Sequence, residues 1–146
     1  MVIGRGCLGR PWLFADLEAA FNGSAERRLP SLGEVAVTMR RHAELLGEWL
    51  GEERGCIEFR KHIAWYLKGF PAGSRVRDHL GRISSYAALD ELLAELDPTA
   101  PFPEAELGTP RGRTNSPGKV FLPDGWLASR DDDTPPDGAE LDDSGG

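Results

Sequence analysis

Two groups of residues in this sequence could do chemistry, and both suit the binding of phosphate. The first is the run Ile3-Gly4-Arg5-Gly6, in which glycine lets backbone N–H groups approach an anion and Arg5 offers a planar, permanently charged fork. In parallel α/β barrels, loops after the last strands often hold a phosphate group. The run matches neither the dinucleotide-binding nor the P-loop glycine pattern. By spacing alone, a plain strand-to-helix turn with one exposed arginine explains it at least as well.

The second group is a basic stretch between Arg60 and Arg82. It holds six basic residues and one acid, a net charge of +5 in 23 residues. Such a stretch attracts polyanions, and structured RNA is bound mainly through its shape and backbone. The alternative is a solvated helix face with aromatic residues in the core, and the sequence favours neither. The candidate RNA-binding residues are Arg60, Lys61, Lys68, Arg75 and Arg77.

The other reactive side chains indicate no catalytic or metal site. Cys7 and Cys56 form neither a C-x-x-C pair nor a ligand cluster with the three histidines, so we expect no disulfide and a reducing cytosol. Cys7 has no evident base nearby, which favours a structural role. His42 falls on an apolar face and is expected to be a core histidine with a hydrogen-bond partner. For His62 the sequence leaves the question open.

The elements that must position these residues begin with residues 1–23. We expect a strand over 1–3, a glycine-rich loop, and a helix that Pro11 opens and Asn22-Gly23 ends. Leu13, Leu17 and Phe21 recur at a spacing of four and define one apolar face of this helix. The order strand, loop, helix predicts the last unit of an α/β fold.

Residues 31–97 are predicted to form a small helical bundle. Ser31 and Glu34 fit a capping box. The helix that follows is expected to point Val35, Met39, His42, Leu46 and Trp49 to one side. A second helix over about 56–68 should direct Phe59, Ile63 and Leu67 inward and Arg60, Lys61 and Lys68 largely outward. A short helix near 74–80 and a last one, capped by Ser84 or Ser85 and ended by Pro98, complete the bundle.

The acidity of the chain is concentrated in residues 98–146. Residues 1–97 carry 13 basic and 14 acidic residues, and residues 98–146 carry 4 and 10, which together give the net charge of −7. The second segment is rich in Pro, Gly and Asp, so we expect it to be mostly disordered, apart from local docking of Val120–Leu127. No apolar run approaches the ~20 residues of a membrane span, so no membrane association is expected.

Two strings together resemble a known family. Val2-Ile3-Gly4-Arg5-Gly6 with Gly9-Arg10-Pro11-Trp12-Leu13-Phe14 is similar to the last barrel strand and the following helix of the tRNA-dihydrouridine synthases. Phe59-Arg60-Lys61-His62-Ile63-Ala64-Trp65-Tyr66 resembles a signature of the bacterial B-type branch. The likeness covers about residues 1–97, and two such strings in the right order are far more specific than either alone.

The resemblance implies a fold and an activity. The fold class would be mostly α, with a remnant of the last βα unit of an FMN-binding TIM barrel, then the bundle, then a disordered acidic tail. Family members reduce the C5–C6 double bond of uridines in tRNA, with NADPH supplying hydride through FMN. The resemblance places Gly4 and Arg5 at the FMN phosphate, and Arg60 and Lys61 against tRNA. The catalytic cysteine of the family matches neither Cys7 nor Cys56.

We therefore expect a C-terminal piece of a cytoplasmic enzyme that docks tRNA, binds neither DNA nor membrane, is monomeric, and by itself neither retains FMN nor reduces uridine. Two alternatives stay open. One is a stand-alone helical RNA-binding module over residues 31–97. The other is the end of a different phosphate-binding flavin barrel enzyme, which fits Gly4 and Arg5 but leaves the string from Arg60 to Tyr66 unexplained.

Overall fold

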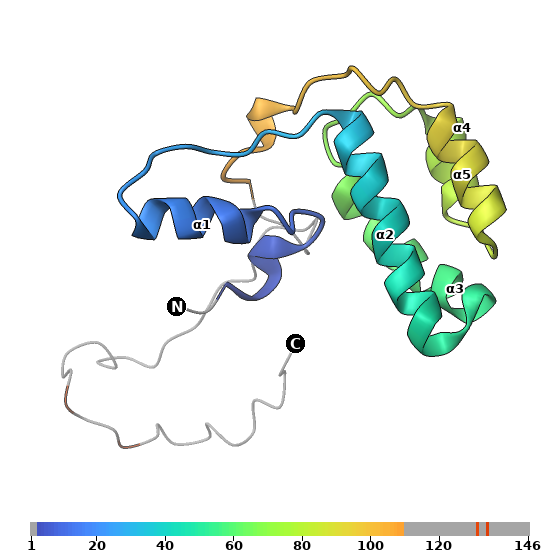
Figure 1. Ribbon diagram of the computed structural model, residues 1–146, viewed down its shortest axis with the longest axis horizontal. Coiled ribbons are helices and arrows are strands. Elements are labelled where there is room, and N and C mark those ends of the chain that lie inside the picture. The colour runs from blue at the N-terminus through green and yellow to red at the C-terminus, as the bar shows by residue number, and fades with distance from the viewer. Residues whose placement is uncertain (1–2, 110–130, 132–133, 135–146) are drawn as a thin grey trace. The chain divides into compact units, whose positions relative to one another are not determined.

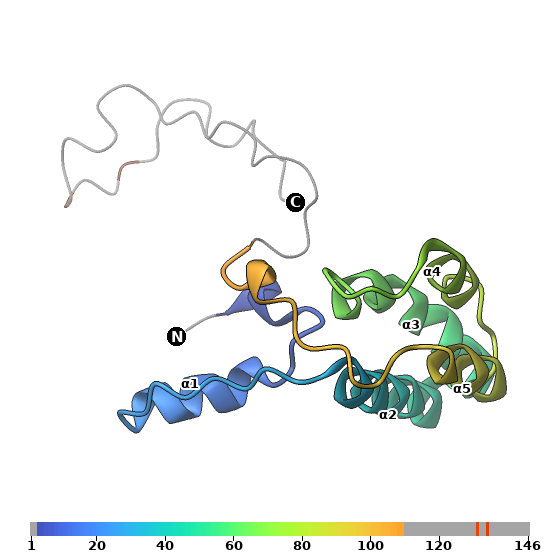
Figure 2. The same ribbon diagram turned by 90° about the horizontal axis from the view of Figure 1, so that it is seen from above.

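The computed structural model describes residues 3–109, 131 and 134. The chain divides into two compact units, Met1–Thr114 and Asn115–Gly146, and every described helix lies in the first. In order these are η1 (Gly4–Cys7), α1 (Leu13–Phe21), α2 (Leu32–Leu50), α3 (Glu52–Tyr66), α4 (Ser74–Leu80), α5 (Tyr86–Ala94) and η2 (Glu104–Glu106). Helices α2 to α5 gather into one bundle (Figures 1 and 2). None of these helices combines the length and the apolar character needed to cross a bilayer.

Helix α2 begins at the predicted capping box. Ser31 Oγ accepts from Glu34 N at 3.4 Å, and Ser31 N donates to Glu34 Oε2 at 2.9 Å. The predicted inward positions Val35 and Met39 are fully buried. Trp49 was wrongly placed on this face, since 86% of it is exposed. At 100° per residue, the ten positions after Met39 leave its side chain about 80° away from the buried face.

Helices α2 and α3 form a hairpin that depends on glycine. Gly51 makes the turn alone with φ +84°, so α3 begins at Glu52 and not near Cys56 as expected. Gly55 lies inside α3, where a Cβ would sit 2.6 Å from Gly47 Cα. Gly47 and Gly55 therefore let the backbones of α2 and α3 approach closely. Gly55 is needed for the packing of these two helices and is not part of the turn.

The core lies where α2, α3, α4 and α5 meet. Its largest fully buried side chains include Phe59, Leu67, Leu80 and Leu89. Ser85, one of the two predicted caps, begins α5 by accepting from Ala88 N at 3.2 Å. The helical bundle and its short helix at Ser74–Leu80 thus follow the sequence pattern.

The segment after α5 stays packed on the bundle, although the sequence placed the start of a mostly disordered tail at residue 98. Leu32 N donates to Ala100 O at 2.9 Å and Gly33 N to Pro98 O at 3.1 Å. Both N–H groups belong to the first turn of α2 and have no acceptor within that helix. Ala100 and Phe102 are buried. Pairing and burial together outweigh the cost of ordering residues 98–109; Val120–Leu127 lies outside the described residues.

The strand expected over residues 1–3 is not formed where the structure describes it. Ile3 is irregular, residues 1–2 lie outside the described part, and no described residue belongs to a strand. A strand needs a neighbour to satisfy its backbone groups. Helix α1, all of which is described, buries no residue and leaves 56% of Phe14 and 74% of Phe21 exposed. Leu13 and Leu17 are half-buried, so the described residues cover the apolar face predicted for this helix only in part.

Candidate functional site

The glycine-arginine turn presents its charge to solvent. Gly4 has φ +51°, and a Cβ built there would have no atom within 4 Å. Arg5 is exposed, and no carboxylate of the described residues pairs with it. Cys7 Sγ donates to Gly4 O at 3.2 Å, which fits the structural role expected for this thiol. An exposed guanidinium without an acid, beside an unobstructed backbone, fits the chemistry of a phosphate ligand.

Gly9 joins this turn to α3. Its φ is +64°, and a Cβ there would lie 2.6 Å from Tyr66 N and closer still to the carbonyl group of Trp65. Only glycine permits this approach of two backbones. Next to it, Trp12 is buried and meets Phe102 edge to face, with ring centroids 6.4 Å apart. The two strings that carry the family resemblance are therefore in direct contact.

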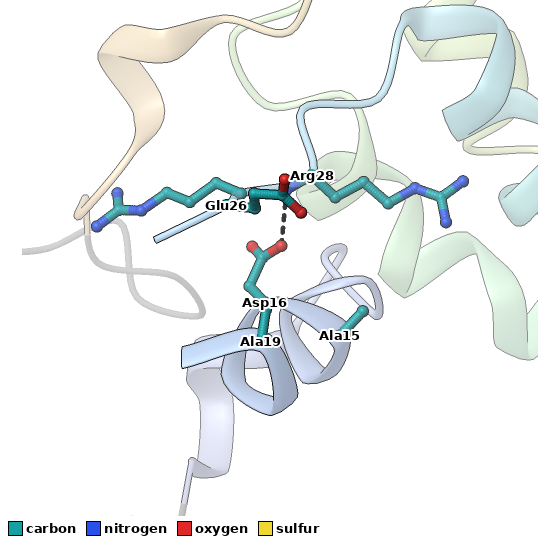
Figure 3. A pocket seen from close by; sticks show the side chains of 6 residues that line it. Ala15, Asp16, Ala19, Glu26 and Arg28 are labelled. Atoms are coloured by element: carbon teal, nitrogen blue, oxygen red, sulfur yellow. Dashed lines mark hydrogen bonds between the residues drawn. The ribbon is translucent and has the colours of Figure 1, made fainter. Parts of the chain in front are cut away.

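A second set of contacts fastens α1 to the connection that follows it. Asp16 accepts from Arg28 N at 2.7 Å and lies 4.0 Å from the Arg10 guanidinium. Asp16 and Arg28 border a pocket between α1 and residues 26–28 (Figure 3). The Asp16 carboxylate already binds the Arg28 N–H group and the Arg10 guanidinium. The charged groups here are therefore explained by the attachment of α1 to the connection that follows it.

Two of the predicted RNA-binding arginines bind main-chain carbonyl groups. Arg60 Nε donates to Ile83 O at 2.8 Å and Arg60 Nη2 to Arg82 O at 3.0 Å. Arg77 Nη2 donates to Leu67 O at 2.8 Å and to Phe70 O at 2.6 Å. Both side chains are half-buried, so Arg60 points outward less than predicted. A carbonyl group is neutral, and no described carboxylate forms an ion pair with either arginine, so no described acid offsets their charges.

The other three predicted contacts are paired with acids. Lys61 Nζ lies 3.0 Å from Glu58 Oε2, Lys68 Nζ lies 3.0 Å from Glu106 Oε2, and Arg75 pairs with Glu95. The side chains of Lys61 and Arg75 remain 62% and 63% exposed. The hydrogen bond from Lys61, followed by its charge, lowers the pKa of Glu58.

These acids weaken the charge contrast that the sequence suggested. The three glutamates lie outside the 60–82 window, so counting along the chain missed them. Including them reduces the net charge from +5 to +2. The surface is thus mildly basic. Main-chain carbonyl groups hold the side chains of Arg60 and Arg77, and the paired cations around them can exchange a carboxylate for another anion.

An aromatic cluster links α2 to α3 beside these cations. His42 Nδ1 and Tyr66 Oη are 3.1 Å apart, the rings of His42 and His62 lie 4.5 Å apart, and His62 meets Trp65 at 5.4 Å. Burial lowers the pKa of His42, and burial with the neighbouring cations lowers that of His62 to about 4. His42 is thus half-buried and hydrogen-bonded, as predicted. The described residues contain no group of three metal-ligating side chains.

Comparison with known proteins agrees with the motifs. The family model described as "Dihydrouridine synthase (Dus)" matches residues 1–100. This chain belongs to the dihydrouridine synthase family. The resemblance stated from the two strings is confirmed.

Several relatives cover the chain to different extents. It is 56% identical over all 146 residues to the "Probable tRNA-dihydrouridine synthase" of Mycobacterium tuberculosis H37Rv, and 56% identical over the same length to that of Mycobacterium leprae. It is 42% identical over 69 residues, 47% of the chain and 21% of the relative, to "tRNA-dihydrouridine synthase B" of Pasteurella multocida, which supports the B-type branch. The chain spans 37% of the first relative and 38% of the second. No solved structure matches it.

Proposed function

We propose that this chain is the tRNA-docking part of a tRNA-dihydrouridine synthase, an enzyme that reduces the C5–C6 bond of uridine with FMN and NADPH. Membership of the dihydrouridine synthase family supports the reaction class. The observation that carries the docking role is the pair of half-buried arginines, Arg60 and Arg77, whose charges no described carboxylate neutralises. Phosphate groups of RNA are the polyanion that such fixed charges suit.

The paired cations would act differently from the fixed ones. A phosphate that binds Lys61 or Arg75 must compete with Glu58 or Glu95 for the same N–H groups. Each such contact therefore contributes less than an unpaired cation would. In this arrangement Arg60 and Arg77 supply constant attraction, and the exposed ion pairs open only where the RNA backbone follows the surface.

Arg5 and Gly4 would hold the phosphate of FMN. The guanidinium would bind phosphate oxygens in two places, and the uncovered Gly4 backbone would allow close approach. Flavin, when bound, supplies the hydride chemistry. We propose that the chain by itself neither retains FMN nor reduces uridine, since it spans 37% of its relative and α1 leaves Phe14 and Phe21 exposed. A flavin absorbance spectrum of the purified chain tests this, and stoichiometric flavin would refute it.

The docking role is tested by the salt dependence of tRNA binding. The variant Lys61→Gln/Lys68→Gln/Arg75→Gln should reduce the slope of log K against log salt by at most roughly 0.7–0.9 per lost phosphate contact. Arg41→Gln is the matched control, because Arg41 is also exposed and ion-paired but lies on α2. Equal slopes for the triple variant and the wild type would place the RNA elsewhere.

Removing an acid should have the opposite effect. Glu58→Gln frees Lys61 from its partner and removes a negative charge from the surface. We expect tighter tRNA binding and a steeper slope. Glu48→Gln, which removes one of the two carboxylates paired with Arg41 on α2, should change neither. Weaker binding by the Glu58 variant would contradict the competition between carboxylate and phosphate.

A further inference from the structure

Helix α4 carries an exposed histidine, His79, in its last turn. The Nδ1 atom of His79 lies 2.7 Å from the main-chain oxygen of Arg75, one turn earlier. A carbonyl oxygen can only accept a hydrogen bond, so Nδ1 carries the hydrogen and donates it. In the neutral imidazole the other ring nitrogen, Nε2, is then an acceptor with a free lone pair. None of the described residues bonds to Nε2, so this lone pair is available to a ligand.

Two arginines flank His79 along the chain. Arg75 precedes it by four residues on the same helix, so the two side chains are neighbours with Cβ atoms about 5–6 Å apart. Arg82 follows the end of α4 and is held against it, because its N–H donates to His79 O at 2.9 Å and its side chain pairs with Asp78 at 3.0 Å. The side chains of Arg75 and Arg82 are 63% and 75% exposed. In chain order a neutral acceptor thus lies between two exposed cations.

The acceptor at His79 differs from the carboxylates beside it. Glu95 pairs with Arg75, and Asp78 pairs with Arg82. Each carboxylate carries a negative charge that repels phosphate, whereas the neutral imidazole does not. Along an RNA strand every ribose lies between two phosphates and carries a 2′-hydroxyl group, which can donate a hydrogen bond. A neutral acceptor between two cations therefore suits a ribose and its two neighbouring phosphates.

We propose that His79 Nε2 accepts a hydrogen bond from a ribose 2′-hydroxyl group of the bound RNA, with Arg75 and Arg82 binding the phosphates on either side. This inference rests on the proposed RNA-docking function and adds to it a means of distinguishing RNA from DNA, which lacks the 2′-hydroxyl group. Every ribonucleotide has this group, so the contact favours RNA without selecting a base. The hydrogen bond from Nδ1 to Arg75 O fixes the ring in its accepting form before RNA binds.

Two probes of equal charge isolate the 2′-hydroxyl group. One is an RNA stem-loop, and the other is the same stem-loop with fluorine in place of every 2′-hydroxyl group, which removes the donor. The assay is run at about pH 8, above the range in which histidine usually binds a proton. The full chain should bind the RNA ~2- to ~13-fold more tightly than the fluorinated probe, the effect of one hydrogen bond. His79→Phe keeps a flat ring without an acceptor, so it should bind both probes with the lower affinity.

Two further variants separate the acceptor from charge and from folding. Arg75→Gln should weaken binding of both probes by the same factor and keep the preference for RNA, because it removes a phosphate contact and leaves the main-chain oxygen in place. His79→Gln supplies an amide oxygen as an acceptor and should keep part of the preference. Equal losses of preference in the Phe and Gln variants would overturn the proposal.

Three other results are also decisive. A preference for RNA that survives unchanged in His79→Phe would overturn the proposal, since another group would then bind the 2′-hydroxyl group. A wild-type chain that binds both probes equally would overturn it as well, while leaving phosphate docking intact. Absence of salt-dependent binding to either probe would instead refute the proposed function.

Discussion

The contact between Gly9 and α3 gives the sharpest test of the fold. In Gly9→Ala the new methyl group would lie 2.6 Å from Tyr66 N and nearer still to the Trp65 carbonyl group. These are backbone atoms in a helix, so no side-chain rotation can relieve the overlap. The left-handed φ of +64° costs a non-glycine residue about 1–2 kcal/mol, and forced displacement of packed groups adds about 1–3 kcal/mol. We expect a total loss of about 2–5 kcal/mol.

Gly23→Ala is the matched control for this substitution. Gly23 also has a left-handed φ, +80°, but a Cβ there would meet no atom within 4 Å. It should lose only the conformational part, about 1–2 kcal/mol. A second pair of variants, Gly9→Asn and Gly23→Asn, has a smaller conformational cost, because Asn tolerates the left-handed region better than Ala does. The difference within each pair isolates the backbone contact.

Urea unfolding of the four variants measures these losses, and hydrogen exchange locates them. Since small domains are stable by about 5–15 kcal/mol, the Ala variant should still fold. Its exchange should rise in the amides near Trp65 and in residues 3–12, while α5 stays protected. Equal destabilisation in the Gly9 and Gly23 variants would show that the two backbones do not touch, and the proposed link between the turn and α3 would fail.

Two further predictions concern the arginines and the histidine pair. Arg77→Met should cost about 1–3 kcal/mol in urea unfolding, because Leu67 O and Phe70 O, which follow α3, each lose a charged donor and keep only a backbone N–H. Arg75→Met should cost about 0–1 kcal/mol, since it breaks an exposed ion pair. Equal costs would refute the role of Arg77 in holding these two carbonyl groups. Burial, then His42 and Lys61, lower the pKa of His62 from 6.5 to about 4, so the folded state binds that proton less well than the unfolded state does. The free energy of unfolding should therefore be at its full value above pH 6.5 and fall by about 1–2 kcal/mol, allowing for screening, between pH 6.5 and 4. In His62→Gln the free energy of unfolding should lose this dependence on pH. An unchanged pH dependence would contradict the prediction.

Local patterns predicted the helices well because local physics decides them. The Ser31 capping box and the buried positions Val35 and Met39 follow from hydrogen bonding and helix period alone. Trp49 was misplaced because a spacing rule carried over ten residues accumulates rotation. The packing of residues 98–109 was missed because its cause is tertiary: Ala100 supplies an acceptor to the start of α2, and Phe102 fills a space beside Trp12.

The candidate site was predicted less completely than the fold. The sequence proposed a set of cations, but it could not show that Arg60 and Arg77 bind carbonyl groups 7–23 residues away along the chain. Nor could it show that Glu95, 20 residues from Arg75, shares its surface. A charge count within a sequence window treats every acid outside the window as absent, so it overstated the positive potential.

The contact at Gly9 changes what the two family strings mean. Read along the chain, one suggests a flavin-phosphate turn and the other an RNA-binding helix, about 50 residues apart. In the structure, the backbone of the first rests on the end of the helix that carries the second. A displacement of α3 would therefore be transmitted to the segment that holds Arg5, with only three residues between Arg5 and the contact. If RNA docks on α3 and FMN phosphate binds Arg5, this glycine fixes the distance between them, and the flavin can meet a base only at the separation that the contact allows.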